Sequence, residues 1–353
     1  EHDRTRTEIY SYMACGAFDE ESERVRKSSD HWRVIAGMSG EAAVAAVHQD
    51  GIDVLIDLSG HTAYARLDLF ALRAAPVQAH YLGFFASTGL EQMDYWIADP
   101  VLVPESMDHH FAERVCRLPR TWVSYRGLDS APLEAWSKRE NTQLTLGSFN
   151  NLPKLNGATL ELWAAVMRAL PQARILLKTK GLEESANRDR IWGALQAYGV
   201  APERVHLVGN TPDWASHMRL YDELDIALDP VGGVGGGTTT CDALWMGVPV
   251  ITLAGDRMAQ RMTASMLNAL GHDEWIAEDR EDYIRKVVLL AQDRALRARL
   301  RPLQREKMRR CALCDAKGLA KALEDAYEAM FDAWWSSDAL SATHPLRQSM
   351  EPE

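Results

Sequence analysis

Short runs of apolar residues recur along the chain, separated by longer stretches in which apolar positions repeat every three or four residues. The run 52–58, IDVLIDL, is nearly all apolar, which is typical of a strand buried on both faces of a parallel sheet. Other runs rich in β-branched and aromatic residues predict further strands. The expected strands are 8–13, 52–58, 77–84, 93–98, 144–149, 174–179, 205–208, 226–228 and 248–253.

The stretches between these runs have the three-and-four spacing of amphipathic helices. The expected helices are 40–48, 63–72, 159–170, 183–198, 239–246 and 257–270, with a charged helical segment over 279–308 and an amphipathic helix over 318–335. Alternation of strands and helices over this length predicts an α/β fold with parallel sheets. Right-handed crossovers would then set its topology.

A chain of 353 residues is long for one core and suits two domains. The polar, turn-prone stretch 125–142 predicts the boundary. We expect one domain over 1–130, a second over 142–315, a helix over 316–335 that packs back, and a tail over 336–353. Strand 8–13 should pair beside an earlier strand, so the first domain is expected to be incomplete at its start.

The net charge of −11 means that the overall field repels nucleic acid and anionic membranes, although solubility alone would also explain it. A phosphate-bearing ligand would need a local positive site. Five scattered cysteines indicate a reducing compartment rather than a disulfide framework, and Cys311 and Cys314 are interpreted as unrelated helix residues. Without a long apolar span or a signal peptide, the protein is expected to be cytoplasmic.

The strongest local feature is the glycine-rich run 232–237, which follows a predicted strand and opens a predicted helix. Glycines let the backbone approach a ligand closely, and a helix N-terminus offers free N–H donors to phosphate. Asp242 follows on the first turn, within reach of a ribose hydroxyl. The run is neither a Walker A loop nor a dinucleotide fingerprint, and a flexible turn capped by threonine is the alternative.

A second candidate is the segment 149–154, FNNLPK, which leaves another predicted strand. Its asparagines offer paired donors and acceptors, and Lys154 offers a point charge for a diphosphate. The alternative is a solvated lysine in an ordinary turn.

Two histidines, His48 and His61, flank the strand 52–58. Histidine is the side chain most easily set to exchange a proton near neutral pH, although a single histidine is more often structural. The sequence contains no D-x-D, so we predict chemistry without a metal. Backbone N–H groups, a lysine and a helix terminus would then stabilise a leaving diphosphate.

Three long runs, 147–156, 224–261 and 69–100, resemble the protein O-linked N-acetylglucosamine transferases and their bacterial relatives, including SPINDLY-type fucosyltransferases. The resemblance covers roughly residues 7–335. It implies two Rossmann-like domains in the two-domain B-type (GT-B) glycosyltransferase architecture, with the donor in the cleft. It also implies inverting transfer from a nucleotide sugar, with UDP-GlcNAc as the expected donor, to Ser or Thr hydroxyls of proteins, and no further cofactor.

The resemblance also implies roles for individual residues. Nucleotide and diphosphate contacts are expected from Asn151 and Lys154, phosphate and ribose contacts from Thr238, Thr239 and Asp242, a histidine near the nucleotide from His217, and a cleft histidine from His48. Gly237 stands where some members have a histidine. Members usually present protein acceptors on upstream tetratricopeptide repeats, which this sequence does not contain. Alternatives are transfer from GDP-fucose or of glucose, nucleotide binding without catalysis, and a sugar-nucleotide epimerase.

Overall fold

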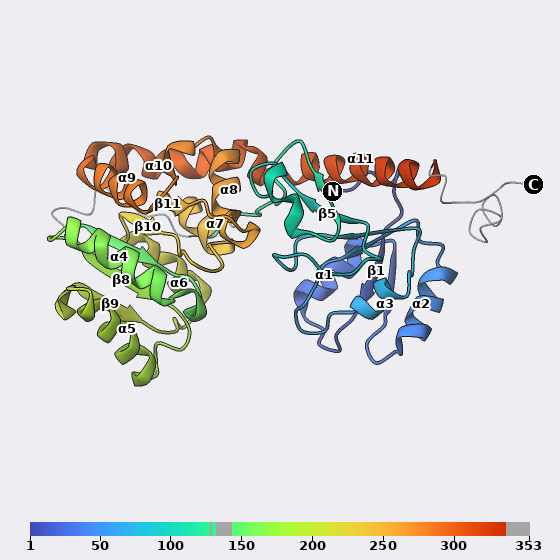
Figure 1. Cartoon of the computed structure of the whole chain (residues 1–353), viewed down its shortest axis with the longest axis horizontal. Coiled ribbons are helices and arrows are strands. Elements are labelled where there is room, and N and C mark those ends of the chain that lie inside the picture. Colours follow the sequence, from blue (N-terminus) through green and yellow to red (C-terminus); the bar gives the residue numbers. More distant parts are fainter. Residues whose placement is uncertain (128, 132–142, 337–353) are drawn as a thin grey trace, which may run out of the picture. The chain divides into compact units, whose positions relative to one another are not determined.

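The computed structural model describes residues 1–127, 129–131 and 143–336, and the chain divides into two units (Figure 1). Unit 1 combines Glu1–Val123 with Lys317–Glu353, and unit 2 comprises Ser124–Ala316. The described part of the predicted connection, 125–127 and 129–131, belongs to unit 2. Its remainder, 128 and 132–142, lies outside the described residues, as does the predicted tail from 337 onward.

Unit 2 is built on one parallel sheet whose first strand lies in the middle. Leu146 on this strand pairs with Ile226 on one side and with Ile175 on the other. The sheet order is β12-β11-β10-β7-β8-β9, the order of a dinucleotide-binding fold counted from its first strand. The strands are β7 (Thr145–Ser148), β8 (Arg174–Lys178), β9 (Val205–Val208), β10 (Ile226–Leu228), β11 (Val250–Leu253) and β12 (Ile276–Ala277).

Helices connect these strands, and several begin at side chains that cap them. The side chain of Asn156 accepts the backbone N–H of Thr159 at the start of α4, and Asp279 accepts that of Asp282 at the start of α9. The helices are α4 (Gly157–Ala169), α5 (Ser185–Ala197), α6 (Trp214–Leu220), α7 (Thr238–Trp245), α8 (Met262–Leu270), α9 (Arg280–Gln292) and α10 (Arg294–Arg310).

Unit 1 contains two parallel sheets. β1 (Tyr10–Met13) pairs with β2 (His31–Val34), which follows it in the chain, and the second sheet has the order β3-β4-β5-β6. That sheet comprises β3 (Val54–Asp57), β4 (Val77–His80), β5 (Tyr95–Ala98) and β6 (Arg114–Arg117), and the unit's helices are α1 (Glu20–Ser28), α2 (Gly40–Gln49), α3 (Leu67–Ala71) and α11 (Ala316–Trp335). A core that includes Ile35, Val47, Leu69 and Phe70 lies between its elements.

The C-terminal helix α11 carries contacts to the first residues of the chain. Glu324, with 2% of its side chain exposed, accepts hydrogen bonds from His2 Nδ1 and from the Asp3 backbone N–H, both at 2.9 Å. Arg6 donates to the same carboxylate. Short 3₁₀ helices complete the fold: η1 (Glu105–His110), η3 (Leu152–Lys154), η4 (Pro202–Arg204), η5 (Tyr221–Glu223), η6 (Met258–Gln260), η7 (Asp273–Trp275) and η8 (Ala312–Cys314).

The structure corrects several predicted elements. The strand predicted over 77–84 ends at His80, and the helix predicted over 63–72 is reduced to α3. The elements β2, β6, β12, α1 and α6 were not predicted. Within the described ranges, no helix combines the length and the apolar character that crossing a membrane requires.

Candidate functional site

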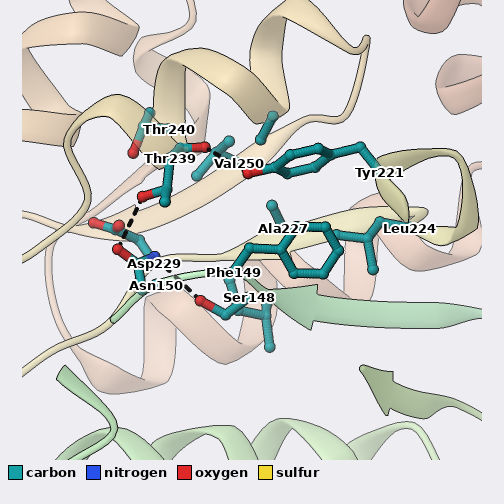
Figure 2. Close-up of a pocket in the computed structure, with 12 residues that line it drawn as sticks. Ser148, Phe149, Asn150, Tyr221, Leu224, Ala227, Asp229, Thr239, Thr240 and Val250 are labelled. Carbon is teal, nitrogen blue, oxygen red and sulfur yellow. Dashed lines mark hydrogen bonds between the residues drawn. The ribbon is translucent and has the colours of Figure 1, made fainter. Parts of the chain in front are cut away.

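The two loops that leave the central strands of unit 2 meet at the carboxyl edge of the sheet. β7 and β10 are neighbours at the point where the strand order reverses, the place where open α/β sheets bind ligands. Lys154 Nζ donates a hydrogen bond to the carbonyl of Gly235, 81 residues away in the chain. Thr239 Oγ1 donates to Asn150 Oδ1 at 2.9 Å (Figure 2). The fold therefore brings the two sequence-predicted features together.

Asn150 joins these two loops, a role that the sequence did not indicate. Its side chain is buried, and its Oδ1 accepts from Lys154 Nζ at 3.3 Å as well as from Thr239. Its Nδ2 donates to Ser148 Oγ at 3.2 Å. The predicted Asn151 is exposed and stands at the start of η3. Of two adjacent asparagines, the one that points inward is the bridge.

Asp229 connects the glycine-rich loop to strand β11 by hydrogen bonds. Its Oδ1 accepts the Gly236 backbone N–H and its Oδ2 accepts the Thr252 hydroxyl, both at 2.7 Å. Burial raises the pKa of Asp229 to about 6, although its hydrogen bonds and the charge of Lys154 lower it. A Cβ on Gly236 would lie 2.1 Å from Thr240 Oγ1 and 2.4 Å from Asp229 Oδ1. Only glycine fits at this position.

Helix α7 begins directly after this loop, with Gly237 as its N-cap. Gly237 offers no side chain to the first-turn N–H groups, and nothing lies within 4 Å of where its Cβ would be. Thr238 and Thr239 form the first turn. An uncapped helix N-terminus beside open space is a suitable site for a phosphate group.

Asp242 lies further along α7 and is oriented by Tyr125. The Tyr125 hydroxyl donates to Asp242 Oδ1 at 2.7 Å. Burial raises the pKa of Asp242, and this hydrogen bond lowers it. Tyr125 is itself held by its backbone N–H, which donates to the Leu313 carbonyl at 2.7 Å. The carboxylate is thus fixed from a second segment of unit 2.

An aromatic group forms one wall of the same region. His217 lies with its ring centroid 5.8 Å from that of Phe149 and 5.6 Å from that of Tyr221. Burial, and secondarily the charge of Lys178, lowers the pKa of His217 to about 4, so the ring is neutral at pH 7. Its buried Nδ1 has no hydrogen-bond partner among the described residues.

A small cavity of about 10 Å³, roughly the space of one ordered water, lies among these groups (Figure 2). Its walls are Ser148, Phe149, Asn150, Tyr221, Leu224, Ala227, Leu228, Asp229, Thr239, Thr240, Ala243 and Val250.

The two histidines predicted in unit 1 lie at opposite ends of the strand between them. His61 follows the carboxyl end of β3, and its Nε2 is 2.9 Å from the Thr88 carbonyl oxygen. His48 lies in the last turn of α2, before β3 begins, and its Nε2 lies 3.4 Å from the carbonyl of Arg73, which precedes β4. Ligands of open α/β sheets bind at the carboxyl ends of strands, so the geometry favours His61 over His48.

The family model of Glycosyl transferase family 41 matches residues 1–126 and 138–323, most of the chain. The chain belongs to glycosyl transferase family 41. Family 41 membership accounts for the two parallel α/β units, which are Rossmann-like units of the GT-B type.

Two plant relatives carry names that specify a donor. The chain is 32% identical over 347 residues to a probable UDP-N-acetylglucosamine–peptide N-acetylglucosaminyltransferase SPINDLY from Petunia hybrida, covering 96% of this chain and 37% of the relative. It is 30% identical to the probable enzyme SEC of Arabidopsis thaliana, covering 94% of this chain and 34% of the relative. The chain therefore spans little more than a third of these curated relatives.

Among solved structures, an O-GlcNAc transferase mutant from Thermobaculum terrenum matches with a TM-score of 0.88 at 36% identity, over 95% of this chain and 64% of that one. Sucrose-phosphate synthase from Thermosynechococcus elongatus matches with a TM-score of 0.57 at 15% identity, over 92% of this chain and 96% of that one, which shows the fold alone.

As regards metals in this family 41 chain, the described residues contain no group of three or more His, Cys, Asp or Glu side chains placed to hold an ion.

Proposed function

We propose that this family 41 chain transfers N-acetylglucosamine from UDP-GlcNAc to Ser or Thr hydroxyls of protein acceptors. The observation that carries the proposal is the convergence of Lys154, the uncapped start of α7 and Asp242 at one edge of the unit 2 sheet. The names of the plant relatives and of the bacterial structure support the choice of donor and acceptor.

The charged groups of unit 2 suit a nucleoside diphosphate. The first-turn N–H groups of α7, with the hydroxyls of Thr238 and Thr239, would hold phosphate oxygens. The ammonium of Lys154 would exchange the Gly235 carbonyl for the diphosphate, whose negative charge grows as the bond to the sugar breaks. We propose that Asp242 accepts hydrogen bonds from the ribose hydroxyls. The neutral ring of His217 would contact the nucleobase.

The transfer that we propose inverts the anomeric carbon. The acceptor oxygen attacks that carbon opposite the diphosphate, so a new C–O bond forms as the C–O bond to the diphosphate breaks. The diphosphate leaves with the electron pair, and the hydroxyl proton passes to a base. His61 is the candidate for that base, because a ring whose Nε2 donates to the Thr88 carbonyl keeps a lone pair on Nδ1. No step requires a metal.

A donor panel tests the binding half of the proposal. Thermal shifts are measured with UDP, GDP, UDP-GlcNAc and GDP-fucose, and a ligand at 100 times its Kd should stabilise the protein by about 2.7 kcal/mol. We expect stabilisation by the two uridine ligands. Stabilisation by the guanosine ligands alone would instead support fucose transfer, and no shift with any ligand would contradict a nucleotide site.

Lys154→Ala tests the catalytic half, with Lys180→Ala as the matched control. Lys180 is an exposed lysine in the loop after the neighbouring strand β8. Loss of one transition-state donor should lower transfer to a peptide acceptor by about 100-fold, whereas the control should keep wild-type turnover. EDTA should leave transfer unchanged. Full activity of Lys154→Ala, or a strict need for Mn²⁺ or Mg²⁺, would contradict the mechanism.

A further inference from the structure

A buried histidine that the proposed chemistry does not use lies at the carboxyl end of β4. His80 is 0% exposed, and its Nδ1 is 2.7 Å from Asp57 Oδ2 at the end of the neighbouring strand β3. Its Nε2 is 3.0 Å from the carbonyl oxygen of Phe84. Burial alone would raise the pKa of Asp57, but hydrogen bonds from His80, Ser59 and Gly60 outweigh it and hold that pKa below its usual value.

The charge state of His80 follows from these contacts. A carbonyl oxygen can only accept a hydrogen bond, and an ionised carboxylate can only accept as well. Both ring nitrogens of His80 therefore donate, which makes the ring an imidazolium paired with Asp57. Burying a charged pair costs free energy unless the other donor and acceptor atoms of both groups also form hydrogen bonds.

The other hydrogen bonds of Asp57 and His80 are made to residues of two loops. Asp57 accepts the backbone N–H of Ser59 at 2.9 Å and that of Gly60 at 2.8 Å, which begin the loop that carries His61. His80 donates to Phe84 in the loop that follows β4. One ion pair thus fixes the start of both loops.

The same two loops touch each other closely. A Cβ on Gly60 would lie 2.4 Å from Phe84 Cβ, and a Cβ on Gly83 would lie 1.8 Å from the Leu58 carbonyl oxygen. Leu82, between His80 and this contact, has the left-handed φ of 72° that few residues other than glycine adopt. Such strain persists only where the surroundings hold it in place.

This packing fixes the position and orientation of the His61 ring. Its ring lies edge-on to Phe84, with centroids 5.2 Å apart, and its Nε2 faces the Thr88 carbonyl. Thr88 is held in turn by the buried Glu113, which accepts its backbone N–H at 2.7 Å. His61 itself is exposed, and its Nδ1 makes no hydrogen bond among the described residues.

We propose that the Asp57–His80 ion pair is a positioning device for His61. It fixes the two loops so that His61 is held as the Nε2–H tautomer and presents the lone pair of Nδ1. The importance of this setting for transfer rests on the proposed function, in which His61 receives the hydroxyl proton. Asp57 and His80 act through the loops and are not themselves the base.

The test reads the histidine rings directly, by ¹⁵N NMR of the imidazoles in the full chain. In the wild type we expect His80 to carry protons on both nitrogens and neutral His61 to carry its proton on Nε2. Asp57→Asn should change the tautomer signature of His61 and lower turnover by roughly 10- to 100-fold, the scale of a small misplacement, without changing the affinity for UDP. If that variant does not fold, His80→Gln replaces it.

Asp94→Asn is the matched control. Asp94 lies in the same unit and accepts from Arg73 at 2.9 Å and from the Gln78 backbone N–H at 2.8 Å, near the opposite end of β4. It should leave the His61 signals in place, even if it destabilises unit 1. A neutral His80 in the wild type, an unchanged His61 in Asp57→Asn, or an equal change in Asp94→Asn would each overturn the inference.

Failure of the proposed function gives a different pattern. If His61→Ala retains full transfer while the NMR signals behave as expected, His61 is not the base and the positioning of its ring still stands.

Discussion

Lys154 and Asp229 show how burial sets the charge of the candidate site before a ligand arrives. Burial lowers the pKa of the Lys154 ammonium and raises that of the Asp229 carboxyl, and the charge of each residue opposes the shift of the other. Burial leaves the charge of the Lys154 ammonium only partly compensated by Asp229, and a bound diphosphate would complete that compensation. A chain with a net charge of −11 can therefore attract an anion through one local contact.

The perturbed carboxyl of Asp229 leads to a prediction about stability and pH. A native pKa of about 6, against about 4 in the unfolded chain, means that the native state binds the extra proton between these values. The resulting contribution, roughly 3 kcal/mol, is present below pH 4 and is lost as pH rises through 6. Asp229→Asn should remove this part of the slope.

The measurement for Asp229→Asn is urea unfolding at several pH values between about 4 and 8. Asn keeps an oxygen that can accept the Gly236 N–H, so the glycine-rich loop should survive the change. A slope between pH 4 and 6 equal to that of the wild type would show that Asp229 is not the group that titrates there.

At the scale of single residues, the sequence indicated candidate ligand residues but not the contacts that these residues make within the protein. Lys154 and Thr239 were predicted as ligands of one nucleotide, and hydrogen bonds to Gly235 and Asn150 do place them in one region. Which of two adjacent asparagines points inward depends on strand register, which local sequence does not reveal. The pairing of His80 with Asp57 depends on which strands are neighbours, and it could not be found from spacing.

At the scale of elements, the glycine-rich loop allows a comparison within one run of residues. Gly236→Ala would place a Cβ within 2.4 Å of a buried carboxylate, whereas a Cβ on Gly233 would meet only Asn156 Nδ2 at 3.3 Å. We expect Gly236→Ala to displace the loop and to weaken UDP binding at least about 10-fold, since the loss of one charge-assisted hydrogen bond exceeds 1.4 kcal/mol.

Calorimetric titration with UDP compares the two alanine variants. Gly233→Ala should bind within about twofold of the wild type, because surface changes away from such contacts cost about 0.5 kcal/mol or less. Equal losses in both variants would mean that glycine is required throughout the loop for flexibility, and that the contact with Asp229 is not decisive.

Burial explains only part of which elements the sequence patterns identified, because β1 was identified although it contains no fully buried residue. All of β10 and the three middle residues of β8 are apolar and buried, so these runs stand out. By contrast β2 and β6 contain no fully buried residue, and α1 buries none. The apolar run 77–84 continues past His80, but backbone contacts around Gly83 turn the chain there. Composition does not reveal that turn.

At the scale of the whole chain, the sequence predicted the class of fold but not the order of its strands. Alternation of strands and helices indicates parallel sheets, yet the position of β7 at the centre of its sheet comes from long-range pairing. That position creates the reversal of strand order where the loops after β7 and β10 meet. The grouping of α11 with the first residues of the chain is likewise a tertiary contact.

The contact between the first residues of the chain and α11 leads to a prediction about unit 1. Glu324 is buried and accepts from His2, Asp3 and Arg6, whereas Glu328, on the same helix, is 58% exposed and also pairs with Arg6. Removing a buried charged acceptor costs about 1.5–3 kcal/mol, and an exposed pair contributes about 0–1 kcal/mol. Glu324→Ala should therefore destabilise unit 1, and Glu328→Ala should have little effect.

Hydrogen exchange followed by mass spectrometry locates the effect of Glu324→Ala. Peptides from unit 1, including β3 to β6, should exchange faster in this variant, because their protection depends on the free energy of opening that unit. Peptides from β7 to β12 should exchange as in the wild type, and UDP should still protect them, because the residues that we propose to bind the nucleotide all belong to unit 2. Equal acceleration in both units would show that the chain unfolds as a single cooperative body. Equal effects of the Glu328→Ala and Glu324→Ala variants would show that burial of the Glu324 carboxylate is not what holds the first residues against α11.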